Sequence, residues 1–197
     1  RAKCLNFMLI YGGYENKLIE LAKSDYDWEM SWDEAHAMRE GYFGLYSGLP
    51  PWHDREKILA RINGYVRIAS GRRRRLPAIM TTNKWERMEA ERQAVNSRVQ
   101  GFIGDYKSMA LIEIDEEVVD ENCKIVGEHH DAVMGIIRDG AEDDYLPRIR
   151  EIMRHPRLLD EFNIKLSIPM MSDIEVGSWG AGNSYSDPKT KEKKIAD

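Results

Sequence analysis

The segment from Asn83 to Glu117 constrains the fold more than any other part of the sequence, because it lacks proline and its apolar residues recur at helical spacing. Such a pattern predicts one long α-helix with other elements packed along it. The residues before it read mostly as shorter helices, and those after it alternate between strands and helices. This order predicts an α+β fold with a helical part followed by a mixed part.

Apolar spacing and helix-end signals predict shorter helices ahead of the long one. They cover residues 3–11, 14–24, 31–46 and 54–63. Ser31 and Glu34 have the spacing of a capping box, and Asp54 is the expected cap of the last helix. The prolines at 50 and 51 predict a hard break before it. Residues 65–69 alternate in polarity before a Ser-Gly pair, which predicts a short strand and a turn.

Beyond the long helix, the apolar segments 125–126 and 132–137 flank the polar stretch 128–131. This arrangement predicts two strands joined by a tight turn. A helix over 144–162 and an extended segment over 165–170 are expected to follow. The lysine-rich stretch 183–197 predicts a flexible tail.

Charge is distributed unevenly along the chain. The net charge is −5, yet residues 55–107 carry thirteen Lys and Arg against five Asp and Glu, a local charge of +8. A basic middle and an acidic remainder fit a protein that holds a polyanion with one face. An ordinary solvated surface remains the alternative from charge alone.

The composition and the pattern of apolar residues also exclude some classes of protein. Apolar residues make up 42% of the chain and charged residues 32%, which fits a folded globular protein. No uncharged apolar run is long enough to span a membrane, so no membrane partner is expected. The chain has two cysteines, Cys4 and Cys123, too few for a disulfide framework. We therefore expect a reducing, cytoplasmic location.

Lys3, Phe7 and Tyr11 are spaced four residues apart in the first predicted helix. Residues at this spacing share one helical face and form a ridge about 12 Å long. A cation and two aromatic rings in this order could bind a triphosphate, its sugar and base, and a neighbouring stacked base. The alternative is an amphipathic helix with two core aromatics and a snorkelling lysine.

The same spacing recurs at Arg92, Asn96 and Gln100 on the long helix. Three polar side chains in this register could follow a duplex minor groove, where every base pair presents purine N3 and pyrimidine O2 acceptors. Such contacts test the shape of a base pair without reading its sequence. The alternative is the solvent face of a helix.

Two further stretches carry candidate functional groups. Arg72, Arg73 and Arg74 form a basic run at a predicted turn, and guanidinium groups suit phosphate oxygens. His130 and Asp131 lie at the predicted turn between two strands, where a carboxylate is a good magnesium ligand. A solvated loop or a localisation signal is the alternative for the arginine run, and hydrogen bonds within the turn are the alternative for His130 and Asp131.

Five blocks in order resemble the family A DNA polymerases, the group of bacterial DNA polymerase I and phage replicative polymerases. The blocks are Lys3-x-x-Asn6-Phe7-x-x-x-Tyr11-Gly12, Gly71 to Pro77, Glu91 to Asp105, His130-Asp131, and Leu166 to Pro169 with Gly177-Ser178-Trp179. The resemblance covers about residues 1–182. It implies a helical fingers subdomain over 1–80 and the C-terminal part of an antiparallel-sheet palm with packed helices over 81–182, before the tail at 183–197.

The resemblance also implies roles for single residues. Lys3 would contact the incoming triphosphate and share in catalysis, Phe7 would pack on its sugar and base, and Tyr11 would stack near the templating base. Gly12 would let the helix end there. Contacts with primer–template DNA would come from the polar residues Arg92, Asn96, Gln100 and His130 and from Arg72, Arg73 and Arg74. Asp131 would bind two Mg²⁺ ions shared with an aspartate outside this sequence.

Departures from the family pattern are informative as well. Ala132 stands where the family commonly has a second acid, and the strand with the other metal-binding aspartate should precede the first helix. We therefore expect a C-terminal portion of a split or truncated polymerase, with a phage enzyme favoured by the departures from the bacterial pattern. It would work with an N-terminal chain or segment, primer–template DNA and deoxynucleoside triphosphates, and be inactive alone. A phage enzyme would act in the host cytoplasm.

Two other functions remain open from the sequence. One is a non-catalytic replication accessory that keeps a polymerase-like fold and binds nucleic acid. Retention of Lys3, Tyr11 and Asp131 together disfavours it, because a binding module needs no metal-binding acid. The other is a fragment of a single-subunit RNA polymerase, which Phe7 and the polar block on the long helix disfavour.

Overall fold

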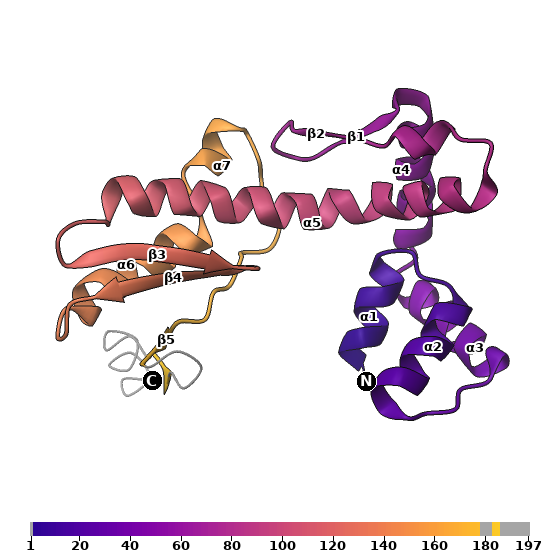
Figure 1. Ribbon diagram of the computed structural model, residues 1–197, viewed down its shortest axis with the longest axis horizontal. Helices are drawn as coiled ribbons and strands as arrows, with labels where there is room; N and C mark the ends of the chain where they lie inside the picture. The colour runs from indigo at the N-terminus through magenta and orange to yellow at the C-terminus, as the bar shows by residue number, and fades with distance from the viewer. Residues whose placement is uncertain (1, 178–182, 186–197) are drawn as a thin grey trace. The chain divides into compact units, whose positions relative to one another are not determined.

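The computed structural model describes residues 2–177 and 183–185, with side chains from Asn6 onward. The chain divides into two compact units, Arg1–Phe102 and Ile103–Asp197, and helix α5 (Lys84–Glu117) contributes to both (Figure 1). The long helix predicted over 83–117 is therefore confirmed. The expected boundary between fingers and palm at residue 80 lies before this helix, and that assignment stays a prediction.

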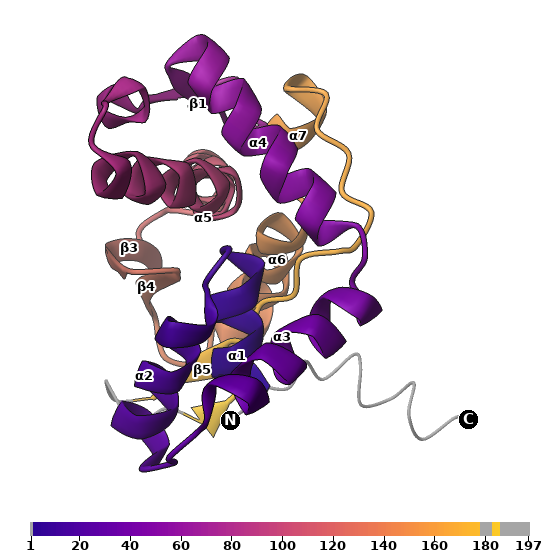
Figure 2. The same cartoon turned by 90° about the vertical axis from the view of Figure 1, so that its right-hand side faces the viewer.

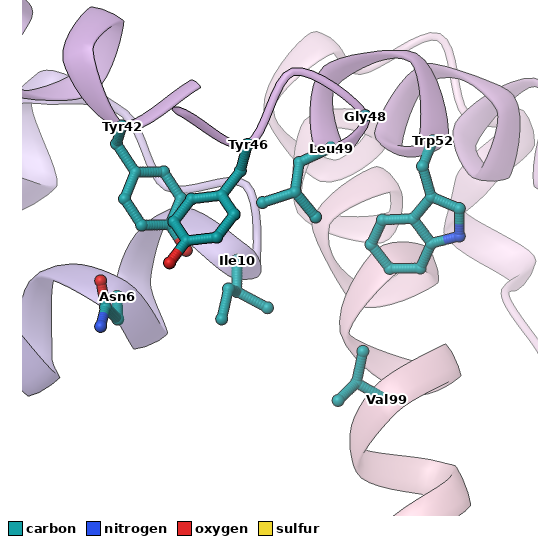
Figure 3. Close-up of a pocket in the computed structure, with 8 residues that line it drawn as sticks. All are labelled: Asn6, Ile10, Tyr42, Tyr46, Gly48, Leu49, Trp52 and Val99. Carbon is teal, nitrogen blue, oxygen red and sulfur yellow. The ribbon is translucent and has the colours of Figure 1, made fainter. Parts of the chain in front are cut away.

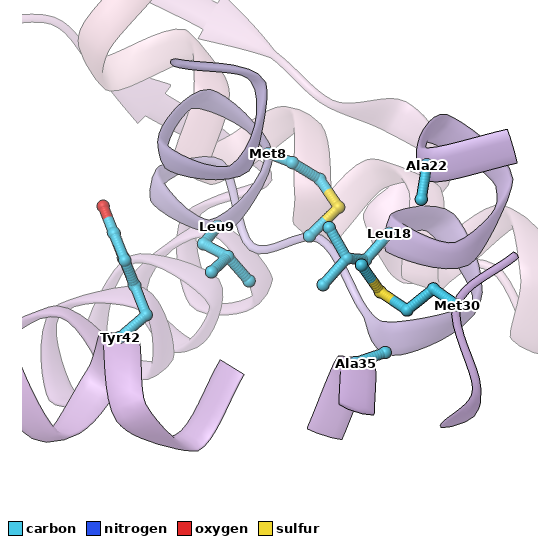
Figure 4. Close-up of a cluster of buried hydrophobic side chains, with 7 residues drawn as sticks. All are labelled: Met8, Leu9, Leu18, Ala22, Met30, Ala35 and Tyr42. Carbon is cyan, nitrogen blue, oxygen red and sulfur yellow. The ribbon is translucent and has the colours of Figure 1, made fainter. Parts of the chain in front are cut away.

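The first unit begins with α1 (Ala2–Ile10), α2 (Glu15–Tyr26) and α3 (Trp32–Leu45), which lie beside one another in Figure 2. Their apolar faces meet in a buried cluster, drawn in Figure 4, of Met8, Leu9, Leu18, Ala22, Met30, Ala35 and Tyr42. The predicted capping box is present, because the Ser31 hydroxyl accepts from the Glu34 amide and the Glu34 carboxylate accepts from the Ser31 amide. These helices were predictable because their capping and apolar spacing are local.

Helix α4 (Leu49–Asn63) begins earlier than the sequence pattern indicated. The break at Pro50 and Pro51 and the cap at Asp54 were both wrong, since the prolines stand inside the first turn. A first-turn amide has no partner within its helix, so a proline there removes no hydrogen bond, and its fixed φ suits the helix. Gly64 ends α4 with φ +72.

A small antiparallel hairpin follows α4. Strand β1 (Tyr65–Arg67) pairs with β2 (Arg73–Arg75), with Tyr65 opposite Arg75 and Arg67 opposite Arg73. The strand at 65–67 was predicted, but most of the arginine run lies in the second strand and not in the turn. The hairpin and the short helix η1 (Pro77–Met80) pack on α4 and α5 through a second buried cluster: Ala60, Val66, Leu76, Ile79, Ala90 and Ala94.

The second unit contains the C-terminal half of α5, the hairpin of β3 (Cys123–His129) and β4 (Ala132–Ile137), and helix α6 (Glu142–Arg154). Their common core consists of Ala110, Ile114, Val118, Cys123 and Ile152. The predicted pair of strands with a tight polar turn is confirmed. With helices and small antiparallel sheets in both units, the α+β prediction is confirmed as well.

Three predictions in the second unit were wrong or incomplete. The helix expected over 144–162 is two helices, α6 and the short α7 (Leu158–Glu161), because Pro156 lacks an amide donor and disfavours a helical conformation at His155. Residues 165–170 belong to none of the described strands. The expected flexible tail starts in a strand, because β6 (Asn183–Ser184) pairs with β5 (Glu175–Val176), and residues 186–197 lie outside the described part.

Within the described residues, no helix combines the length and the apolar character needed to cross a membrane.

Candidate functional site

Phe7 and Tyr11 share one face of α1, as their spacing predicts. Their rings stack with centroids 6.3 Å apart and planes inclined by 28°. Phe7 is 47% exposed, and Tyr11 is half-buried. Neither ring belongs to the buried cluster, which takes Met8 and Leu9 from the other side of the helix. The alternative of two core aromatics is therefore wrong, whereas the side chain of Lys3 lies outside the described part.

The end of α1 depends on a glycine pair. Gly12 has φ +77 and donates to the Leu9 carbonyl, and Gly13 donates to the Met8 carbonyl. A side chain at Gly13 would place its Cβ 2.6 Å from the Met8 Cγ. Positive φ is costly for residues with a Cβ, which favours glycine at Gly12, and the close approach of Met8 favours glycine at Gly13. The helix therefore stops just before Tyr11.

Two side chains from other helices contact this end of α1. The Gln100 Nε2 of α5 donates to the Tyr11 hydroxyl at 2.6 Å. The His53 Nε2 of α4 lies 2.7 Å from the Ile10 carbonyl oxygen, so this nitrogen carries the proton and donates. His53 is buried, and burial lowers the pKa of its imidazole below the ordinary value. Sequence reasoning missed His53, because no local pattern marks a histidine that bonds a residue 43 positions away.

The predicted polar row on α5 is only partly available to a ligand. Arg92 is exposed and pairs with Glu89 one turn away at 2.7 Å. Asn96 is half-buried, and its buried Oδ1 has no hydrogen-bond partner among the described residues. Gln100 is exposed and reaches Tyr11. Of the three residues predicted to contact a duplex, Gln100 is thus the one that the structure brings together with Tyr11.

The arginine run presents cations on the β1–β2 hairpin. Arg73 and Arg74 are exposed, and the Arg73 guanidinium lies 5.1 Å from the centre of the Tyr65 ring. Arg72 differs from them, because its Nη2 donates to the Gly101 carbonyl of α5 at 3.3 Å. The run therefore combines an anchoring arginine with arginines that face solvent.

His130 and Asp131 form the turn between β3 and β4, since His129 pairs with Ala132 on either side of them. Both are exposed, and His130 adopts the left-handed conformation with φ +51. The rings of His129 and His130 lie 4.1 Å apart. Lys107 of α5 donates to the His130 carbonyl at 2.8 Å and pairs with Glu128 at 2.9 Å.

The surroundings of Asp131 bear on its expected role as a magnesium ligand. An exposed carboxylate provides the hard oxygen donors that Mg²⁺ prefers, so the residue fits such a role. Among the described residues, however, no group of three or more His, Cys, Asp or Glu side chains could hold a metal ion. Asp131 would supply one ligand of a site and would need further ligands.

A cavity of about 490 Å³ lies beside α1 in the first unit (Figure 3). Its lining residues come from α1, α3, α4, α5 and the α3–α4 connection: Asn6, Ile10, Tyr42, Tyr46, Gly48, Leu49, Trp52 and Val99. Asn6 and Ile10 lie on a different face of α1 from Phe7 and Tyr11. Phe7 and Tyr11 are not among the residues that line this cavity.

A sequence model described as DNA polymerase family A matches residues 1–181. The chain belongs to this family. The DNA polymerase I of Pseudomonas aeruginosa is 29% identical over 179 residues, which cover 90% of this chain and 18% of the relative. The DNA polymerase I of Streptococcus pneumoniae serotype 4 is 30% identical over 183 residues, covering 90% of this chain and 19% of the relative.

A solved structure is similar as well. It is described as the POL domain of Pol1 from M. smegmatis in complex with DNA primer-template and dNTP. The TM-score is 0.72 and the sequence identity is 28%, and the match covers 85% of this chain and 28% of that chain. The present chain spans about a fifth of the length of the curated relatives named above. The resemblance inferred from the five sequence blocks is thus confirmed at the level of the family.

Proposed function

We propose that this chain is the C-terminal part of a template-directed DNA polymerase, which adds deoxynucleotides to a primer 3′ end. The observation that carries the proposal is the hydrogen bond between Gln100 and Tyr11 within one compact unit. It joins the helix assigned to the incoming nucleotide to the helix assigned to the duplex. A new base pair at the growing end must contact both surfaces at once.

The residues of the first unit would divide the binding of substrates. Lys3 would contact the triphosphate, the exposed ring of Phe7 would pack on the sugar and base, and Tyr11 would stack near the templating base. Gly12 would let the helix end there. The residues assigned to the duplex are Arg92, Asn96 and Gln100, with Arg72, Arg73 and Arg74 near the phosphates. Guanidinium groups and backbone phosphates give sequence-independent, salt-dependent binding.

The second unit would contribute His130, assigned to the primer terminus, and Asp131, which would hold Mg²⁺. When bound, two Mg²⁺ ions stabilise charge on the attacking and leaving oxygens of a phosphoryl transfer. The primer 3′-hydroxyl would attack the α-phosphate in line, so that the new P–O bond forms as the bond to pyrophosphate breaks and the hydroxyl proton passes to solvent. The family pattern puts another metal-binding aspartate ahead of α1. We therefore propose that this acid comes from polymerase sequence outside these 197 residues, on the same or another chain.

Several finer expectations stay predictions. A phage origin, a natural division of the polymerase and a cytoplasmic location remain inferences from the sequence. The curated relatives named above are bacterial, with names that describe DNA polymerase I. The family match favours a DNA polymerase over a single-subunit RNA polymerase. A non-catalytic accessory is the remaining alternative.

Primer extension with purified components tests the proposal. The chain alone, the N-terminal polymerase portion alone and their mixture are each incubated with primer–template, Mg²⁺ and deoxynucleotides. We expect template-directed extension in the mixture and in neither portion alone. Reactions with ribonucleotides and with a primer that lacks a template are the controls. Extension by the isolated chain would contradict the shared metal site. DNA binding without extension in the mixture would favour the accessory.

A further inference from the structure

Lys107 links the long helix to the turn that carries Asp131. Its ammonium donates to the His130 carbonyl oxygen at 2.8 Å and pairs with the Glu128 carboxylate at 2.9 Å. The Lys107 side chain is only 15% exposed, whereas that of Glu128 is 56% exposed. The lysine end of the ion pair is therefore largely covered, and α5 runs beside β3 in this unit (Figure 1).

The backbone at this turn needs support. His130 adopts φ +51, a conformation that costs a residue with a side chain about 1–2 kcal/mol and persists where the surroundings hold it. The ladder behind the turn is also irregular, because the register shifts between Ile125 and Gly127. Bulges of this kind bend and twist a strand. The pairs between this shift and the turn are regular, so the left-handed backbone at His130 is the feature that the surroundings must hold.

The Lys107 contact fixes the atoms that connect to Asp131. The His130 carbonyl belongs to the peptide unit whose other half is the Asp131 amide, and that unit is planar. A hydrogen bond that holds the oxygen therefore sets the plane on which the Asp131 Cα lies. A lysine ammonium has three donors, so one residue can bond the carbonyl and the Glu128 carboxylate together.

We propose that Lys107 is a positioning residue for Asp131. It orients the His130–Asp131 turn from α5 and so sets where the Asp131 carboxylate meets Mg²⁺. This inference rests on the proposed function, because it needs Asp131 to be the metal ligand. Glu128 pairs with the same ammonium, and because its carboxylate is largely exposed, we expect the ion pair to contribute little free energy and to act mainly on the geometry of the turn.

Substitutions at both ends of the contact test the inference. Lys107→Met removes the donors at similar length, Lys107→Arg keeps donors and charge, and Glu128→Gln removes the ion pair but leaves the carbonyl bond. Lys124→Met is the matched control, because Lys124 is exposed on β3 at the far end of the hairpin from the turn. Two readouts are compared: amide exchange and the HN–Hα coupling at residues 130 and 131 by NMR, and the half-saturating Mg²⁺ concentration for extension.

Lys107→Met should speed amide exchange at the turn and raise the half-saturating Mg²⁺ concentration about tenfold, as the loss of a group that supports a metal ligand commonly does. Its kcat at saturating Mg²⁺ should change less. Lys107→Arg should keep both readouts close to those of the wild type. Glu128→Gln should shift them weakly, and Lys124→Met should leave them unchanged.

Two outcomes are kept distinct. If Asp131→Ala keeps normal extension, the proposed function fails at that residue. If Asp131→Ala abolishes extension but Lys107→Met leaves both the turn and the Mg²⁺ requirement unchanged, the positioning role of Lys107 is overturned alone. A loss of kcat in Lys107→Met with an unchanged Mg²⁺ requirement would also overturn it.

Discussion

The Gln100 amide donates to the Tyr11 hydroxyl over 2.6 Å, across 89 positions of sequence. The contact joins the end of α1 to the middle of α5. In the proposed polymerase, each residue would contact the growing end of the duplex from its own segment. The bond therefore brings together two side chains that the proposal assigns to the growing end of the duplex.

A double-mutant cycle of Tyr11→Phe and Gln100→Leu should give a coupling free energy of about 0.5–1 kcal/mol in urea unfolding of the free chain. The low end is expected because Gln100 is exposed. Gln93→Leu is the control, since Gln93 bonds Glu89 within the same helix. Strictly additive effects of the two changes would show that the bond has no energetic role.

Gly12→Ala should destabilise the chain by about 1–2 kcal/mol, because φ +77 forces a Cβ into an unfavourable conformation. Gly44→Ala in α3 is the matched control. A Cβ at Gly44 meets no atom within 4 Å, so this change should be neutral or stabilise by up to about 1 kcal/mol. Thermal unfolding of both variants checks the difference, and equal effects would argue against the described end of α1.

The stability of the chain should depend on pH through His53. Burial, with Lys57 and Arg39 nearby, lowers the pKa of this imidazole in the fold, against smaller raising effects of Asp54 and the Ile10 carbonyl. As the pH falls, His53 therefore takes up a proton in the unfolded chain at a higher pH than in the folded chain. The free energy of unfolding contributed by this group should be full above the ordinary value of 6.5 and fall as the pH drops below it.

Urea unfolding at pH 7.5 and 5.5 measures this dependence. His53→Gln, which cannot titrate, should show a smaller loss of stability at the lower pH than the wild type. His129→Gln, at an exposed position on β3, should keep the wild-type loss. An unchanged pH dependence in His53→Gln would mean that His53 is not the group responsible.

Arg98→Met should destabilise the first unit by about 2–3 kcal/mol, because it removes the more buried of the two arginines that pair with a buried carboxylate. Glu56 is 3% exposed and pairs with Arg98 at 3.1 Å, and Arg98 also bonds the Arg67 carbonyl of β1. Arg55→Met is the control, because Arg55 pairs with Glu56 from an exposed position and should cost under about 1 kcal/mol. A smaller loss of stability in Arg98→Met than in Arg55→Met would show that Arg55 is the more important partner of Glu56.

What the sequence could predict follows from the range of the interactions involved. The capping box at Ser31, the glycine end of α1 and the hairpin around His130 depend on neighbouring residues, and all were predictable. The start of α4 was missed because Pro50 has opposite effects in the first turn and in the interior of a helix.

The remaining features depend on contacts between distant elements. The arginine run became a strand only because Tyr65–Arg67 lies opposite it. The His53 and Lys107 contacts span 43 and 23 positions, so no local spacing reveals them. The candidate ridge of Phe7 and Tyr11 was found from helical spacing, whereas the side chains that hold its end were not.

Primer extension by the completed polymerase with Asp131→Ala is the most direct test of the central claim. Asp139→Ala, which removes an exposed carboxylate after β4, is the matched control. We expect Asp131→Ala to abolish Mg²⁺-dependent extension while primer–template binding, measured by fluorescence anisotropy, stays close to wild type, and Asp139→Ala to keep both. Near-normal turnover in Asp131→Ala would contradict the assignment of this residue and of the site built around it.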